Sequence, residues 1–135
     1  MFVRSRGPHK AVGLYAHITW HTWRRERCIR KADVACITTA VLEAANRCRV
    51  RVHSQAVLTD HVHLVISFAP DTTLSSFIRH AKSKSALLVN QRGQSGRAVR
   101  WCRGYYANTL SWSAVAAARN YVGSQFRLHP DRIPP

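Results

Sequence analysis

Residues 50–68, VRVHSQAVLTDHVHLVISF, contain two β-type segments separated by the polar pair Thr59-Asp60. Branched apolar residues favour strands on both sides of this pair, and the pair itself suits a tight turn. Side chains alternate along a strand, so His61 and His63 point to one face while the valine between them points to the other. The stretch therefore predicts a β-hairpin whose second strand presents two imidazoles on one face.

The segments on either side of this hairpin alternate between strand and helix patterns. We expect a strand over Val12 to Thr22, a helix from about Ala32 to Arg47, a helix with an apolar face from Leu74 to Leu88, a strand over Trp101 to Trp112 and a last helix from Ser113 to about Leu128. This order predicts an α+β fold: a ferredoxin-like, split βαβ antiparallel sheet with helices on one face, plus a C-terminal helix that carries Tyr121. We expect a single domain over residues 1–135, with its core at about 12–128, a flexible basic N-terminus and a short disordered tail after residue 130.

Charge indicates the class of partner. The chain has 135 residues, enough for one core, and its 21 Lys and Arg against 6 Asp and Glu give a net charge of +15. Such a charge concentrates polyanions at the surface, which favours nucleic acid over a ribosome-associated or merely basic protein. The four cysteines form no C-x-x-C pair, which argues against a zinc knuckle or a disulfide scaffold. No apolar run reaches the length of a membrane span, so we expect a cytoplasmic protein with no membrane partner.

Two pairs of residues could carry chemistry. The side chains of His61 and His63 could both reach a metal ion above the sheet, or could simply be hydrogen-bonded histidines. Tyr121 and Gln125 lie four residues apart on one face of the last helix, at the edge of its apolar stripe. A tyrosine at such an edge could equally pack its ring and expose its hydroxyl to water. Neither pair decides the function alone.

Taken together, five segments resemble the single-tyrosine HUH transposases of the smallest bacterial insertion sequences, the IS200-like transposases. The resemblance spans about Leu14 to His129. It rests on the strand from Leu14 to His21, the Asp60-His61-Val62-His63-Leu64 segment, the lysine-containing helix from Phe77 to Leu88, the Trp101-x-x-Gly104-Tyr105-Tyr106 segment and the Tyr121-Val122-x-x-Gln125 helix. Leu58-Thr59 departs from the Met-Pro that relatives often carry before the aspartate, which marks a diverged member.

The resemblance implies an enzyme that nicks and rejoins single-stranded DNA at hairpin-bearing element ends through a 5′-phosphotyrosine intermediate. Tyr121 would be the nucleophile, and His61, His63 and Gln125 would hold one divalent ion, Mg²⁺ or Mn²⁺. It also implies a homodimer whose active sites are shared between subunits, although the sequence leaves open whether the site forms within or between chains. The alternatives are a domesticated relative that processes chromosomal repeat hairpins, and a non-catalytic nucleic-acid-binding protein with a ferredoxin-like sheet.

Supporting roles are expected for further residues. Asp60 could orient an imidazole or merely form the turn. DNA contacts are expected from basic and aromatic side chains, on which unpaired bases could stack. These candidates are Arg24, Arg25, Arg27, Arg30, Arg79, Lys82, Lys84, Trp101, Tyr105 and Tyr106. Each could instead belong to a solvated basic surface or to ordinary packing.

Overall fold

The computed structural model describes residues 13–92 and 98–135. Its centre is a four-stranded antiparallel sheet in the order β2-β3-β1-β4. The strands are β1 (Tyr15–His21), β2 (Val50–Val57), β3 (His61–Phe68) and β4 (Tyr106–Leu110). The predicted hairpin is therefore confirmed, with its turn between β2 and β3.

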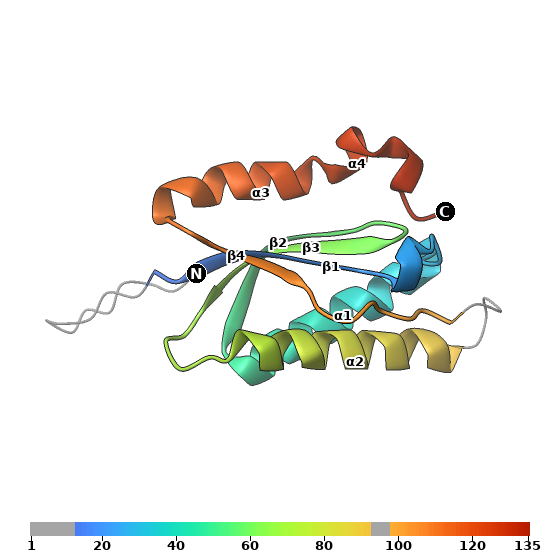
Figure 1. Ribbon diagram of the computed structural model, residues 1–135, viewed down its shortest axis with the longest axis horizontal. Helices are drawn as coiled ribbons and strands as arrows, with labels where there is room; N and C mark the ends of the chain where they lie inside the picture. Colours follow the sequence, from blue (N-terminus) through green and yellow to red (C-terminus); the bar gives the residue numbers. More distant parts are fainter. Residues whose placement is uncertain (1–12, 93–97) are drawn as a thin grey trace, which may run out of the picture.

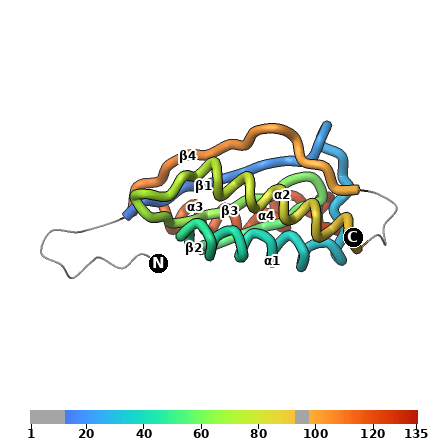
Figure 2. Tube along the Cα trace, turned by 90° about the horizontal axis from the view of Figure 1, so that it is seen from below, coloured from blue at the N-terminus to red at the C-terminus, as the bar shows by residue number. Residues whose placement is uncertain are grey.

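Helices cover both faces of the sheet (Figure 1). Two long helices, α1 (Lys31–Cys48) and α2 (Leu74–Arg92), run side by side along one face, as Figure 2 shows from below. The opposite face is covered by α3 (Val115–Gly123) and the short α4 (Gln125–Leu128). Single turns of 3₁₀ helix occur at η1 (Trp23–Arg25), η2 (Trp112–Ala114) and η3 (Pro130–Arg132).

The connections interleave two β-α-β units. β1 and β2 are joined through α1 and flank β3, while β3 and β4 are joined through α2 and flank β1. In each β-α-β unit, the two strands are separated in the sheet by one strand of the other unit. This is the split βαβ arrangement. The predicted fold class is confirmed, with the tyrosine-bearing helix on the face opposite α1 and α2.

Alternation along β1 and β3 separates two apolar clusters. Ala16, Ile18 and Trp20 of β1 and Val62, Leu64 and Ile66 of β3 are buried against α1 and α2 in the main core. A second cluster lies on the other face, beneath α3. It consists of Tyr15, Ala56, Leu58, Val65, Val115 and Val122. The histidine face of β3 is therefore the face that the last helix covers.

Three predicted boundaries were wrong. The last strand begins only at Tyr106, because Gly104 turns the backbone into the left-handed region (φ 83°) and Trp101 forms only an isolated bridge with Thr22. The second helix continues to Arg92. The last helix begins at Val115, because Ser113 lies inside η2, and it is interrupted at Ser124.

The predicted disorder of the C-terminal tail is also wrong. Arg132 in η3 forms an ion pair with buried Asp60, and the backbone N–H of Lys31 donates to the carbonyl of Pro135 at 2.8 Å. These contacts fix the tail against the rest of the domain. The basic N-terminus, predicted to be flexible, lies outside the described residues. Within residues 13–92 and 98–135, the helices are too short or too polar to cross a bilayer.

Candidate active site

His61 and His63 lie side by side on the face of β3 that α3 covers. Their ring centroids are 4.8 Å apart, and both side chains are buried. Strand alternation explains their common direction, and the cross-strand neighbours in β1 are His21 opposite His61 and Thr19 opposite His63. The prediction that the two imidazoles share one face is confirmed.

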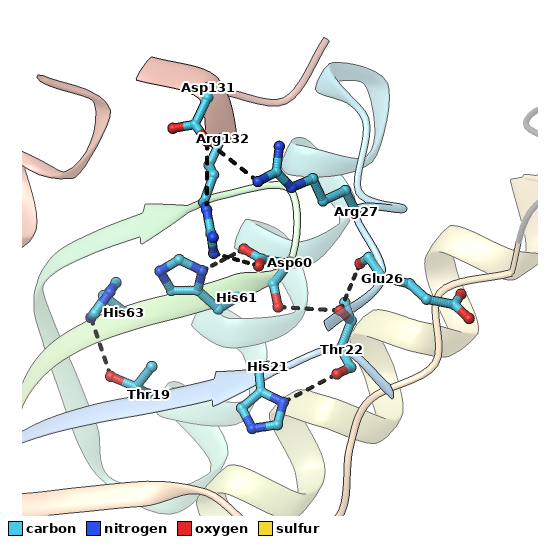
Figure 3. Close-up of polar contacts among 10 residues, drawn as sticks. All are labelled: Thr19, His21, Thr22, Glu26, Arg27, Asp60, His61, His63, Asp131 and Arg132. Atoms are coloured by element: carbon cyan, nitrogen blue, oxygen red, sulfur yellow. Dashed lines mark hydrogen bonds and ion pairs between the residues drawn. The ribbon is translucent and has the colours of Figure 1, made fainter. Parts of the chain in front are cut away.

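Hydrogen bonds engage the Nδ1 atom of each histidine. The Nδ1 atom of His61 contacts the carboxylate of Asp60 at 2.6 Å, which agrees with the orienting role considered for that residue (Figure 3). The Nδ1 atom of His63 lies 3.1 Å from the hydroxyl of Thr19 and 3.0 Å from Nε2 of His17. When Nδ1–H donates to these partners, the Nε2 lone pair of each ring stays available to bind a metal ion.

Burial keeps this cluster neutral. Desolvation lowers the pKa of His63 to about 3, and the neighbouring His61, His17 and His129 act in the same direction. Burial also lowers the pKa of His61, although the carboxylate of Asp60 opposes that shift. The pKa of His17 is lowered by burial as well. At neutral pH these rings are therefore uncharged, which is the form of imidazole that binds metals.

Tyr121 meets the histidines from α3. Its ring centroid lies 5.8 Å from that of His63 and 5.9 Å from that of His17, edge-on in both cases. The side chain is nevertheless 46% exposed, because Tyr121 sits at the margin of the helix face that Val122 buries. A phenol in this position contacts the imidazoles with one part of its ring and remains accessible to a substrate.

Gln125 contributes a buried oxygen that has no hydrogen-bond partner. The residue is 1% exposed, and its Nε2 donates to the carbonyl of Tyr121 at 3.2 Å. Its Oε1 is one of four buried side-chain polar atoms without a partner among the described residues. Gln125 differs from the other three residues in its position along the chain. It lies one helical turn after Tyr121, which contacts His63. It also lies one turn before His129, whose ring centroid is 6.4 Å from that of His61.

A cation would satisfy that oxygen, since an unpaired buried carbonyl is costly. In the part of the chain that the structure describes, His, Cys, Asp and Glu side chains alone form no group of three that could hold a metal ion. The third candidate ligand here is the amide of Gln125, which is not one of those residue types. The donor set of two imidazole nitrogens and one amide oxygen fits a divalent ion.

The predicted DNA-contacting residues fall into separate groups. Arg24, Arg25 and Arg30 are exposed around η1 and the start of α1, and the charge of Arg25 is near enough to His61 to lower the pKa of that imidazole. Tyr105 and Tyr106 are exposed, and the ring of Tyr106 lies 6.5 Å from that of His17. Arg27 is also exposed but pairs with Asp131 at 3.3 Å.

The remaining candidates lie away from the histidines. Arg79 and Lys84 are exposed on α2, on the opposite side of the sheet. Lys82 donates to the carbonyls of Cys102 and Gly104 at 2.7 and 2.8 Å. Trp101 donates from its indole to Ser85 and packs edge-on against Trp20. Lys82 and Trp101 therefore tie α2 to the segment before β4.

Sequence reasoning assigned no role at the site to four residues around the candidate ligands. His17 and Thr19 contact His63, the ring of His129 lies beside that of His61, and Arg132 pairs with Asp60. Alternation along β1 places His17 and Thr19 on the histidine face, but only the register with β3 shows that they meet His63. His129 and Arg132 carry no sequence signal of this kind, because their contacts depend on the path of the chain after α4.

Acid should destabilise the metal-free protein through His63. Its folded pKa is about 3 and its unfolded value 6.5, so below pH 6.5 the unfolded chain binds a proton that the folded chain does not. The free energy of unfolding should therefore fall between pH 7.5 and pH 5, by about 2 kcal/mol from this group alone. Urea unfolding in EDTA measures it.

His63→Asn should lose most of that pH-dependent difference, whereas His80→Asn, on α2 behind the sheet, is the control and should behave like wild type. An identical fall in stability for wild type and His63→Asn would contradict the buried, neutral state of His63.

Comparison with known proteins identifies the family. The family model described as "Transposase IS200 like" matches residues 10–125. The transposases for insertion sequence element IS200 of Salmonella typhimurium and Salmonella typhi are each 32% identical to this chain over 89 residues. That segment covers 62% of this chain and 57% of the length of the Salmonella proteins.

Two solved structures share the fold. A Deinococcus radiodurans R1 protein described as a candidate transposase superposes with a TM-score of 0.67 at 19% identity, over 92% of this chain and 98% of its own. A REP-associated tyrosine transposase bound to a REP hairpin gives 0.69 at 15% identity, over 96% and 74%. Because the matching family model runs from before β1 to Gln125, this chain belongs to the IS200-like transposase family.

Proposed function

We propose that this protein is a transposase that nicks and rejoins single-stranded DNA at hairpin-bearing ends, with Tyr121 as nucleophile and a divalent ion held by His61, His63 and Gln125. The observation that carries the proposal is the meeting of the tyrosine helix and the histidine strand. Tyr121 is in ring contact with His63, and one turn later Gln125 buries an unpaired oxygen. Family membership supports the same reaction class.

The ligand set is consistent with Mg²⁺ or Mn²⁺. The two imidazoles are kept neutral by burial, each with Nδ1 engaged, and the amide oxygen of Gln125 adds a harder donor. Three protein ligands leave coordination positions for phosphate oxygen. A bound divalent ion would offset the negative charge that develops on the phosphate during displacement.

Tyr121 supplies the covalent step. Its phenolic oxygen forms a bond to phosphorus while the bond from phosphorus to the 3′ oxygen breaks. The phenol gives up its proton and the departing 3′ oxygen gains one, so the products are a 5′-phosphotyrosine and a free 3′-hydroxyl. The reverse attack by a 3′-hydroxyl rejoins DNA and releases the tyrosine. Bond energy is conserved in the ester, so no nucleotide cofactor is needed.

Exposed rings and arginines around the candidate site suit the substrate. Tyr106 is 59% exposed and contacts His17, which in turn contacts Tyr121, so an unpaired base could stack beside the reacting phosphate. Arg25 lies close enough to His61 for its charge to lower the pKa of that imidazole, and Arg24 precedes it in η1. The net charge of +15 adds a general attraction for DNA. We assign the DNA contacts nearest the reacting phosphate to Tyr106, Arg24 and Arg25. We expect the reaction to occur in the cytoplasm.

A second candidate function is the processing of repeated chromosomal hairpins by a domesticated relative. It is favoured by the likeness in fold to a REP-associated tyrosine transposase bound to a REP hairpin. The chemistry would be the same, and the two functions differ in whether the cut ends belong to a mobile element. A pure binding protein is less consistent with these residues, because binding alone does not require Tyr121, Gln125 and the histidine pair to meet.

Within one chain, the tyrosine helix already reaches the histidine strand. Tyr121 contacts His63 of its own chain, and the ordered tail holds the end of the helix against the same domain. We therefore propose that cleavage takes place in cis. The family resemblance implies the opposite, a homodimer in which the active sites are shared between subunits. That arrangement stays a prediction.

Removing one hydroxyl should separate the enzyme from a binding protein. We expect wild-type protein, incubated with labelled single-stranded hairpin DNA and Mn²⁺, to form an adduct that survives denaturing electrophoresis. Tyr121→Phe should reduce its formation on the order of 1000-fold or more, because the nucleophile is lost while the ring remains. Tyr106→Phe is the matched control and should form the adduct. The proposal would be contradicted if Tyr121→Phe formed the adduct at the wild-type rate, or if the wild-type protein formed no adduct with any hairpin.

Mixing two inactive variants should show whether the site acts in cis. Tyr121→Phe keeps the histidines and His63→Ala keeps the tyrosine, so a shared site would be complete in a mixed dimer. The cis proposal predicts no adduct from the mixture beyond the sum of the two variants alone. Recovery to a substantial fraction of wild-type adduct would establish exchange of the helix between subunits.

A further inference from the structure

The chain after α4 returns to the turn that precedes the histidine strand. The backbone N–H of Thr59 donates to the carbonyl of Arg132 at 2.9 Å, and Pro134 is buried. Figure 3 shows the side chain of Arg132 reaching from η3 toward Asp60, beside His61. The tail is thus in contact with the residue that immediately precedes the first candidate ligand.

Asp60 links this tail to His61. Its side chain is 2% exposed, and each carboxylate oxygen has its own partner. Oδ1 contacts Nδ1 of His61 at 2.6 Å, and Oδ2 accepts a hydrogen bond from Nη1 of Arg132 at 2.7 Å. The side chain of Arg132 is 29% exposed, so water competes little for the pair.

Two fixed partners determine how the carboxylate is turned. A carboxylate with a single partner can rotate or tilt about that hydrogen bond, whereas one held at both oxygens cannot. Arg132 also supplies the cation that a buried carboxylate requires, since a buried charge without a counter-charge is strongly unfavourable. The direction of the Nδ1–H bond of His61, and hence that of its Nε2 lone pair, depends on this carboxylate.

We propose that Arg132 is a positioning residue for the metal ligand His61 and acts on it through Asp60. The inference rests on the proposed function, in which His61 binds a divalent ion. Arg132 itself touches neither the ion nor the reacting phosphate. The chain that follows the tyrosine helix would thereby help to hold one ligand of the metal site in place.

The sign of the electrostatic effect makes this inference testable. Arg132 is a cation close to a site for a cation, so the loss of its charge alone should strengthen metal binding. The loss of its positioning effect should weaken binding. A change that removes the arginine therefore gives opposite results under the two accounts.

The experiment measures Mn²⁺ affinity by calorimetry in protein free of DNA. Arg132→Gln should bind Mn²⁺ about 10-fold more weakly than wild type, the lower end of the range for a direct partner of a metal-binding histidine, because Arg132 acts through Asp60. Arg127→Gln, which removes an exposed arginine of α4, is the matched control and should bind as tightly as wild type or slightly better. Arg132→Lys, which keeps a cation able to reach the carboxylate, should recover part of the loss.

A double variant tests the route through Asp60. If Arg132 acts through that carboxylate, Asp60→Asn with Arg132→Gln should bind Mn²⁺ no more weakly than Asp60→Asn alone. A merely structural role for Arg132 predicts additive losses. Should Arg132→Gln melt below the assay temperature, Arg132→Met, which retains the apolar part of the side chain, replaces it.

The outcomes separate this inference from the proposed function. Mn²⁺ binding that is unchanged or tighter in folded Arg132→Gln, together with binding that is lost in His61→Ala, would overturn the role of Arg132 alone. Wild-type binding that is insensitive to both His61→Ala and His63→Ala would overturn the metal site itself, and the role of Arg132 with it.

Discussion

A small apolar contact between α3 and the sheet determines how Tyr121 and Gln125 lie relative to the histidines. Val115 and Val122, seven residues apart on one face of the helix, are buried with Leu58 and Val65 of the hairpin. Burying each such side chain contributes about 1.5–3 kcal/mol. Without this cluster, no apolar contact would hold Tyr121 and Gln125 beside the histidines, because the main core lies on the other side of the sheet.

That packing has an electrostatic consequence for the site. His61, His63 and Asp60 are all buried, so the imidazoles are neutral and the carboxylate depends on Arg132 for its counter-charge. Every nitrogen or oxygen so enclosed requires a partner, and the oxygen of Gln125 has none among the described residues. Buried polar atoms without a hydrogen-bond partner concentrate where a protein binds something. A divalent ion would give the oxygen of Gln125 its partner.

Much of this arrangement can be predicted from periodicity. Alternation along β3 gives the common direction of His61 and His63, and helical spacing gives that of Tyr121 and Gln125. The residue at which the last strand begins could not be predicted. The aromatic run at Trp101 looks like a strand, and only Gly104, with its left-handed backbone, interrupts it. The tail could not be predicted either, since its order comes from a pair between Arg132 and Asp60, 72 residues apart.

The central claim is that the tyrosine helix and the histidine strand share one ion. Crystals grown with Mn²⁺ and measured at a wavelength where manganese scatters anomalously test it most directly. The account predicts a single strong anomalous peak bounded by Nε2 of His61, Nε2 of His63 and Oε1 of Gln125, at roughly 2.0–2.3 Å from each. A manganese peak bound elsewhere, or none at saturating metal with the three side chains ordered, would contradict it.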